Sequence, residues 1–127
     1  MPPEEATCGL AGGVFYHNSH VRFEDILDGL SNTIFVGERN SVKDFSTWVG
    51  VVRGAKTPIT RIVGTTLRVP NSRDAEFEDF SSRHLGLTLF LFGDGGVRAL
   101  KDNMDAETFQ SIGTRANLDV INQKELK

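Results

Sequence analysis

The chain has 127 residues, 39% hydrophobic and 24% charged, and its 14 Lys and Arg against 17 Asp and Glu give a net charge of −3. This composition is typical of one globular domain and excludes an intrinsically disordered chain. The mild acidity argues against sequence-independent binding to nucleic acid, so no nucleic-acid partner is expected. The longest apolar run, Leu87–Phe92, falls far short of the ~18 residues that cross a bilayer. We expect a single domain over residues 1–127, with an irregular lead-in at 1–13 and a frayed tail at 124–127.

Only short elements are predicted before residue 33. Val14–Tyr16 is β-prone, and Val21–Phe23 is either a short strand or the approach to a helix. Glu24–Asp28 carries acidic residues at its start and stops at Gly29, so one short helical turn is expected there.

Strands are predicted where β-branched and aromatic residues gather. Thr33–Glu38 and Thr47–Val52 are such segments, and Arg61–Val69 is a weaker one. Pro70–Asp74 has the composition of a loop. Leu87–Phe92 is apolar at nearly every position, which is typical of a central strand rather than an edge strand.

A hairpin and a helix are predicted near the C-terminus. Asp94-Gly95 separates Leu87–Phe92 from Val97–Leu100, which predicts a type I′ turn with positive φ at both central residues. Asp105 is the expected N-cap of a helix over Ala106–Ile112, and Gly113 is its expected C′ residue.

These elements predict the fold class. About five or six strands with one or two short helices indicate an α+β domain that is mainly an antiparallel β-sheet. A parallel α/β fold would need crossover helices that the sequence does not contain.

Ser81, Ser82, His84 and Asp94 are the residue types of a nucleophile, a base and an orienting acid. No Gly-x-Ser-x-Gly elbow surrounds the serines, however, and Asp94 is already explained as a turn residue. We therefore favour a structural role in which His84 bonds backbone near the start of the central strand, and we expect no catalytic residue. A ligand or ion role for His84 is the alternative.

Metal and cofactor sites have weaker support. His17 and His20 are spaced for one helix face, but their neighbours indicate a turn and no His-Glu-x-x-His pattern is present. Several acidic residues could hold calcium: Asp25, Asp28, Asp74, Glu76, Glu78 and Asp79. Their spacing does not match an EF-hand, and we favour a solvated surface for residues 76–79. No metal and no cofactor are expected. Cys8 is the single cysteine, which excludes an intrachain disulfide, and Trp48 is either a core residue or a platform for carbohydrate stacking.

Three blocks of the sequence together resemble a family. The first reads DGLSNTI from Asp28, with Gly29, Ser31, Asn32 and Thr33, and continues into VGER with Glu38. The second runs from Phe80 through Ser81, Ser82 and His84 to Asp94 and Gly95, and it resembles an H-x9-D-G signature. The third is TFQ from Thr108 with GTRA from Gly113. In this order the blocks resemble a planctomycete-type family of exported proteins, the domain of unknown function 1559.

The resemblance implies a place and an architecture. Members begin with a prepilin-like hydrophobic helix, followed by an exported head domain. It therefore implies an extracytoplasmic, cell-envelope location, a pilin-like or pseudopilin-like head and other envelope or pseudopilin-like proteins as partners. Membrane contact would come only through that helix, which this sequence does not contain. The motif residues quoted above are then expected to define the fold.

Our leading hypothesis is a non-enzymatic head domain of a pseudopilin-like envelope protein that acts in assembly or surface interaction. His84, Asp94 and Gly95 would form one fold-defining clasp. The alternative is a binding module for a sugar or small solute, with or without calcium, whose concave site would contain Trp48, Tyr16 or His84. A small hydrolase is the third hypothesis, and it requires a serine hydroxyl beside His84.

Overall fold

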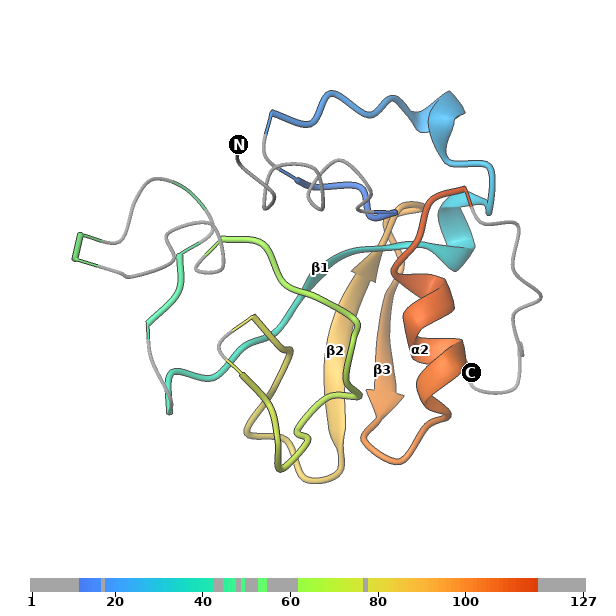
Figure 1. The fold of residues 1–127 in the computed structure, drawn as a ribbon. Coiled ribbons are helices and arrows are strands. Elements are labelled where there is room, and N and C mark those ends of the chain that lie inside the picture. The colour runs from blue at the N-terminus through green and yellow to red at the C-terminus, as the bar shows by residue number, and fades with distance from the viewer. Residues whose placement is uncertain are drawn as a thin grey trace.

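A computed structural model describes residues 12–16, 18–42, 45–47, 49, 53–54, 62–76 and 78–116. Within these ranges the chain forms three strands, one α-helix and two 3₁₀ turns (Figure 1). In chain order they are η1 (Phe23–Asp25), η2 (Leu30–Asn32), β1 (Ile34–Gly37), β2 (Leu87–Phe92), β3 (Val97–Lys101) and α2 (Ala106–Ile112). The α+β class with an antiparallel sheet is confirmed.

The three strands form one antiparallel sheet in the order β1-β2-β3. β2 lies in the centre, as its apolar sequence predicts, and its side chains alternate between full and partial burial. Opposite Leu91 stand Val36 of β1 and Val97 of β3, so these three residues share one face of the sheet. A bulge at Phe35 shifts the β1 register between Ile34 and Val36.

The hairpin between β2 and β3 is confirmed, but its turn is not type I′. Gly95 has positive φ at 84°, whereas Asp94 does not. The Gly95 amide donates to the Phe92 carbonyl and the Phe92 amide donates to the Gly96 carbonyl. This is a three-residue loop that ends in a left-handed glycine. The Asp94 carboxylate accepts from the Gly96 amide at 2.9 Å, which explains why Asp94 keeps an ordinary backbone conformation.

One hydrophobic core lies between α2 and the sheet. Asp105 caps α2 as predicted, accepting from the Thr108 amide at 2.8 Å. Phe109 and Ile112 of α2 then pack with the inward side chains of the sheet in a cluster of seven buried residues: Ile34, Phe90, Phe92, Leu100, Met104, Phe109 and Ile112. The Phe90 and Phe109 rings meet edge to face at a centroid distance of 5.7 Å.

Gly113 ends α2, but not in the left-handed conformation of a C′ glycine. Its φ is −80°, which any residue adopts. A Cβ at this position would lie 2.1 Å from Thr66 Oγ1. The glycine is therefore required by the close approach of the 62–69 segment and not by its own backbone.

Several predicted strands do not form. Val14–Tyr16 and Arg61–Val69 are irregular in their described residues. Val21–Phe23 leads into η1, which is the second of the two alternatives predicted for it, the approach to a helix. In its described residues the weaker strand is replaced by a single parallel bridge between Thr65 and Asp79, and Gln110 Nε2 donates to the Leu67 carbonyl. The predicted strand Thr47–Val52 lies largely outside the described residues, as do Cys8, His17, Trp48 and the tail at 124–127.

The sheet face turned away from α2 carries exposed apolar side chains. Val36 is 54% exposed and Val97 is 63% exposed, although both lie in strands. Leu91 between them is half-buried, and the next pair on this face is Leu89 with the exposed Ala99. We call these five residues the outer sheet face.

Candidate functional site

The first motif block folds on itself around Gly29. This residue has φ 95° and precedes η2, where a residue with a side chain would be strained. The Asn32 amide and the buried Thr33 hydroxyl both donate to the Gly29 carbonyl, at 3.1 Å each. Asn32 Nδ2 donates to the Asp28 carbonyl at 3.0 Å. Polar side chains thus satisfy the backbone of this tight double turn.

The β2–β3 turn of the second block docks on this double turn. The Gly93 amide donates to the Thr33 carbonyl at 3.0 Å, and the Asp94 amide donates to the Leu30 carbonyl at 3.1 Å. Arg98 of β3 bridges the two blocks by donating to the Ser31 carbonyl at 2.6 Å and to Asp94 Oδ2 at 3.2 Å.

The third block closes the same end of the molecule. The Asp28 amide donates to the Arg115 carbonyl at 3.0 Å, and the Thr114 hydroxyl lies 3.3 Å from Asp28 Oδ2. We call this assembly of the three blocks the turn-end cluster. Asp28, Gly29, Ser31, Asn32, Thr33, Asp94 and Gly95 all belong to it.

Glu38 organises the opposite end of β2. Its amide donates to the Leu89 carbonyl at 3.2 Å, while its carboxylate Oε2 accepts from the Leu89 amide at 2.9 Å. The side chain therefore takes the place of a backbone acceptor and extends the β1–β2 pairing by one residue. Glu38 Oε1 lies 3.4 Å from His84 Nε2, and the Glu38 carbonyl accepts from the Ser81 amide.

Ser82 and Asn71 complete this end. The Ser82 hydroxyl donates to the Leu87 carbonyl at 2.6 Å and accepts from the His84 amide at 3.0 Å. Asn71 Oδ1 accepts from the Ser82 amide at 2.9 Å, and Asn71 Nδ2 lies 3.0 Å from both Asp102 carboxylate oxygens. We call Glu38, Asn71, Ser81, Ser82, His84 and Asp102 the His84-end cluster.

The H-x9-D-G residues consequently do not form a single clasp. His84 precedes β2 and Asp94 follows it, so the whole strand, about 20 Å long, separates them. The Ser82 hydroxyl is already engaged with two backbone groups. A triad of serine, His84 and Asp94 is therefore incompatible with this arrangement.

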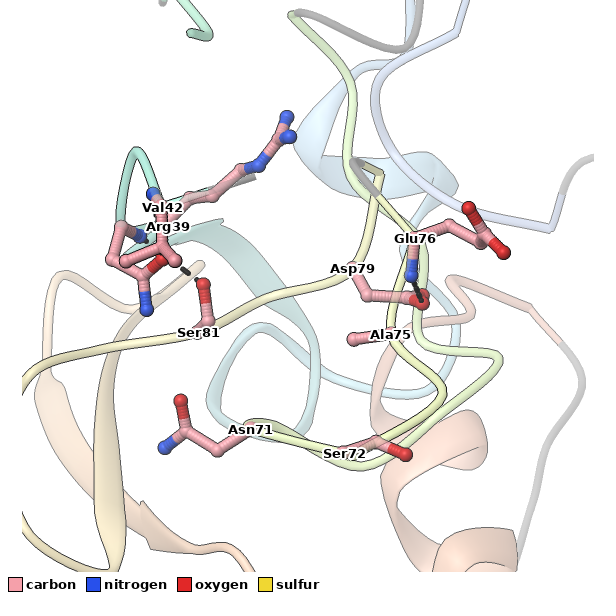
Figure 2. Close-up of a pocket in the computed structure, with 9 residues that line it drawn as sticks. Arg39, Val42, Asn71, Ser72, Ala75, Glu76, Asp79 and Ser81 are labelled. Carbon is pink, nitrogen blue, oxygen red and sulfur yellow. Dashed lines mark hydrogen bonds between the residues drawn. The ribbon is translucent and has the colours of Figure 1, made fainter. Parts of the chain in front are cut away.

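Two adjoining cavities open beside the His84-end cluster. The larger has a volume of about 350 Å³ and is lined by Glu38, Arg39, Asn40, Ser41, Ser81, Ser82, Arg83 and His84. The smaller, of about 200 Å³, shares Arg39, Asn40 and Ser81 with it. Figure 2 shows Arg39 and Ser81 on one side of the smaller cavity and Glu76 and Asp79 on the other. We call the larger cavity the Arg83 groove.

Comparison with known proteins identifies the family. The model of the proteins of unknown function DUF1559 matches residues 2–107. The chain belongs to this family. No curated protein and no solved structure matches the chain. The third motif block, from Thr108 onward, lies beyond the matched residues of this DUF1559 chain.

Metal ligands do not gather in the described part of the DUF1559 chain. No group of three or more His, Cys, Asp or Glu side chains within those ranges could hold a metal ion. Asp79, which the sequence places on a solvated surface, is instead 2% exposed. Its carboxylate accepts from Arg68 at 2.9 Å, from the Glu76 amide at 2.8 Å and from the Thr65 hydroxyl at 3.1 Å. The solvated interpretation of Asp79 is wrong, because its buried carboxylate pairs with the partly exposed Arg68 and so anchors the 62–69 segment.

The proposed sugar platform is not assembled by the residues described. Tyr16 lies under the Arg115 guanidinium at 5.3 Å and does not line the cavity that His84 lines. Trp48 is outside the described residues. None of the helices in the described ranges has the length and apolar character needed to cross a membrane.

Sequence reasoning missed Asn71, Asp102 and Arg83. Asn71 sits in a segment that reads only as a loop, yet it holds φ 57° and joins three segments. Its position after Pro70 in a turn was the available signal, because asparagine tolerates left-handed backbone better than other residues with side chains. Arg83 offers no signal in the sequence beyond its place between Ser82 and His84.

Proposed function

We propose that this chain is a non-enzymatic head domain of the cell envelope, outside the cytoplasm, and that it assembles with pseudopilin-like proteins. The outer sheet face would pack against an apolar helix of such a partner. The observation that carries this proposal is the exposure of Val36 and Val97, which flank the central strand on the sheet face opposite the core that α2 covers.

The chemistry of this face supports a helical partner. Val36, Leu91 and Val97 form a cross-strand row, and Leu89 with Ala99 extends it along the strands. An antiparallel sheet normally presents alternating polar residues to water on its outer face. An apolar row there exposes surface whose burial contributes about 25 cal/mol per Å², so a helix with an apolar stripe would gain by covering it.

Photo-cross-linking in the producing cell tests this proposal. A photoreactive phenylalanine analogue at position 97 is expected to cross-link to an apolar helical segment of an envelope protein, identified by mass spectrometry. Leu67 is the matched control position, because it is 61% exposed but its carbonyl bonds Gln110 on the α2 side. Equal cross-linking from both positions, or recovery of the protein in the cytoplasm, would contradict the proposal.

A further inference from the structure

We propose that the Arg83 groove binds a small oxyanion, a carboxylate or a phosphate group carried by a solute. The groove is a separate surface from the outer sheet face and shares no residue with it. It is an open surface groove with a volume of about 350 Å³. The inference goes beyond the assembly role proposed above and does not depend on it.

The acceptor atoms around the groove are already engaged by the protein. The Glu38 carboxylate receives the Leu89 amide on one oxygen and faces His84 Nε2 with the other. Asn40 Oδ1 accepts from the Val42 amide at 3.2 Å, and the Ser81 hydroxyl oxygen accepts from the Asn40 amide at 3.1 Å. Each of these oxygens thus already receives a hydrogen bond from the protein or faces a ring nitrogen.

The donors around the groove are in excess. Ser81 accepts a bond through its oxygen but no described group receives its hydroxyl hydrogen, and the same holds for the Nδ2 of Asn40. Within the described residues Arg83 has neither an ion-pair nor a hydrogen-bond partner. A hydroxyl, an amide and a guanidinium thus line this cavity without a described protein group that accepts their hydrogens. A ligand with several acceptor oxygens and a negative charge is complementary to this set.

Charge places the anion at the Arg83 end. The guanidinium groups of Arg39 and Arg83 line the groove together with one carboxylate, that of Glu38. The adjoining smaller cavity is lined by Glu76, whose exposed carboxylate repels an anion, and by Asp79, whose buried carboxylate is paired with Arg68 (Figure 2). The guanidinium of Arg83 can also present two parallel N–H groups to a planar carboxylate or to two phosphate oxygens.

Titration followed by ¹H–¹⁵N NMR tests this site. Inorganic phosphate and the sugar acid glucuronate are added separately to the whole chain at constant ionic strength, with chloride as the reference. Saturable shifts are expected at the Asn40 side-chain amide and at the backbone of residues 81–84, and not in the turn-end cluster. The two arms distinguish a phosphate from a carboxylate ligand.

Matched variants distinguish specific binding of the anion at Arg83 from nonspecific attraction to positive charge on the protein surface. Arg83→Gln is expected to weaken binding about tenfold, and Arg83→Lys, which keeps the charge but loses the planar fork, by an intermediate factor. Arg73→Gln removes the same charge from an exposed position that lines neither cavity, and a change below about twofold is expected because solvent and salt screen this surface charge strongly. Shifts that fail to saturate with either anion, or equal weakening by Arg83→Gln and Arg73→Gln, would overturn the proposal.

Discussion

Asn71 illustrates how one side chain can hold three segments together. Its backbone lies in the left-handed region at φ 57°, its amide nitrogen contacts both oxygens of Asp102, and its amide oxygen receives the Ser82 amide. The residue thereby joins the 70–74 loop, the start of β2 and the end of β3. Hydrogen bonds to a charged group stabilise more than those between neutral groups, so most of its contribution comes from Asp102.

We predict that Asn71→Ala lowers the free energy of unfolding by about 3 kcal/mol, of which about 1 kcal/mol is left-handed strain on alanine and the rest is lost hydrogen bonding. Asn18 is the matched control: it has φ 59° and is exposed, and its side chain makes no hydrogen bond to a described residue. Asn18→Ala is therefore expected to cost only about 1 kcal/mol. Urea unfolding measures both values, and equal losses would show that the Asn71 side chain contributes nothing.

Helices and strands were predicted correctly where residues within the element determine its structure, and were missed where distant residues determine it. β2, the hairpin and α2 were predictable because an apolar run, an Asp-Gly pair and an N-cap aspartate act within a few residues of themselves. Arg61–Val69 also has β-prone residues, but the described backbone groups of Thr65 and Leu67 bond the distant Glu78 and Gln110. No local pattern reports such partners.

The candidate site shows the same limit. The motif residues could be selected from the sequence, but their division into two clusters could not. His84 and Asp94 are separated by a strand whose length follows from its extended geometry, yet nothing in the motif says that each residue bonds a different neighbour. The excess of donors in the Arg83 groove depends on backbone amides that occupy the acceptors, which only the folded chain reveals.

Gly113 gives a prediction at the junction of α2 with the 62–69 segment. Gly113→Ala is expected to cost about 2 kcal/mol through overpacking, because the new methyl group would meet Thr66 Oγ1 and Cγ2 at 2.1 and 2.7 Å. Thr66→Ala removes both atoms and is expected to recover most of that loss in the double variant. Thermal unfolding of the four proteins measures this coupling.

Gly95 supplies the contrasting control for that experiment. Its φ is 84° and a Cβ there would meet nothing within 4 Å. Gly95→Ala should therefore cost about 1 kcal/mol from backbone strain alone, with no coupling to Thr66→Ala. If Thr66→Ala does not recover the stability lost in Gly113→Ala, the contact with Thr66 is not the cause of that loss. Gly113 would then act only by ending the helix.

Over the whole molecule, the two clusters anchor opposite ends of the central strand. The turn-end cluster joins the first, second and third motif blocks, and the His84-end cluster joins β1, the 70–74 loop and the end of β3. Between them lies the single core of the described chain, formed by the inward residues of the sheet with α2. Loss of either cluster should weaken the same cooperative unit, because both fix β2 within that core.

The separation of the clusters predicts additive energetics. Thr33 is fully buried and its hydroxyl donates to the Gly29 carbonyl at 3.1 Å, so Thr33→Val keeps the shape and is expected to cost about 1 to 2 kcal/mol. Asn71 lies at the other end of β2, about 20 Å away along the strand. Sites so far apart without shared partners add to within about 0.5 kcal/mol, so the double variant should lose the sum of the two single losses in one unfolding transition. A coupling above about 1 kcal/mol would instead indicate that His84, Asp94 and their neighbours act as one clasp after all, with strain transmitted along the six residues of β2.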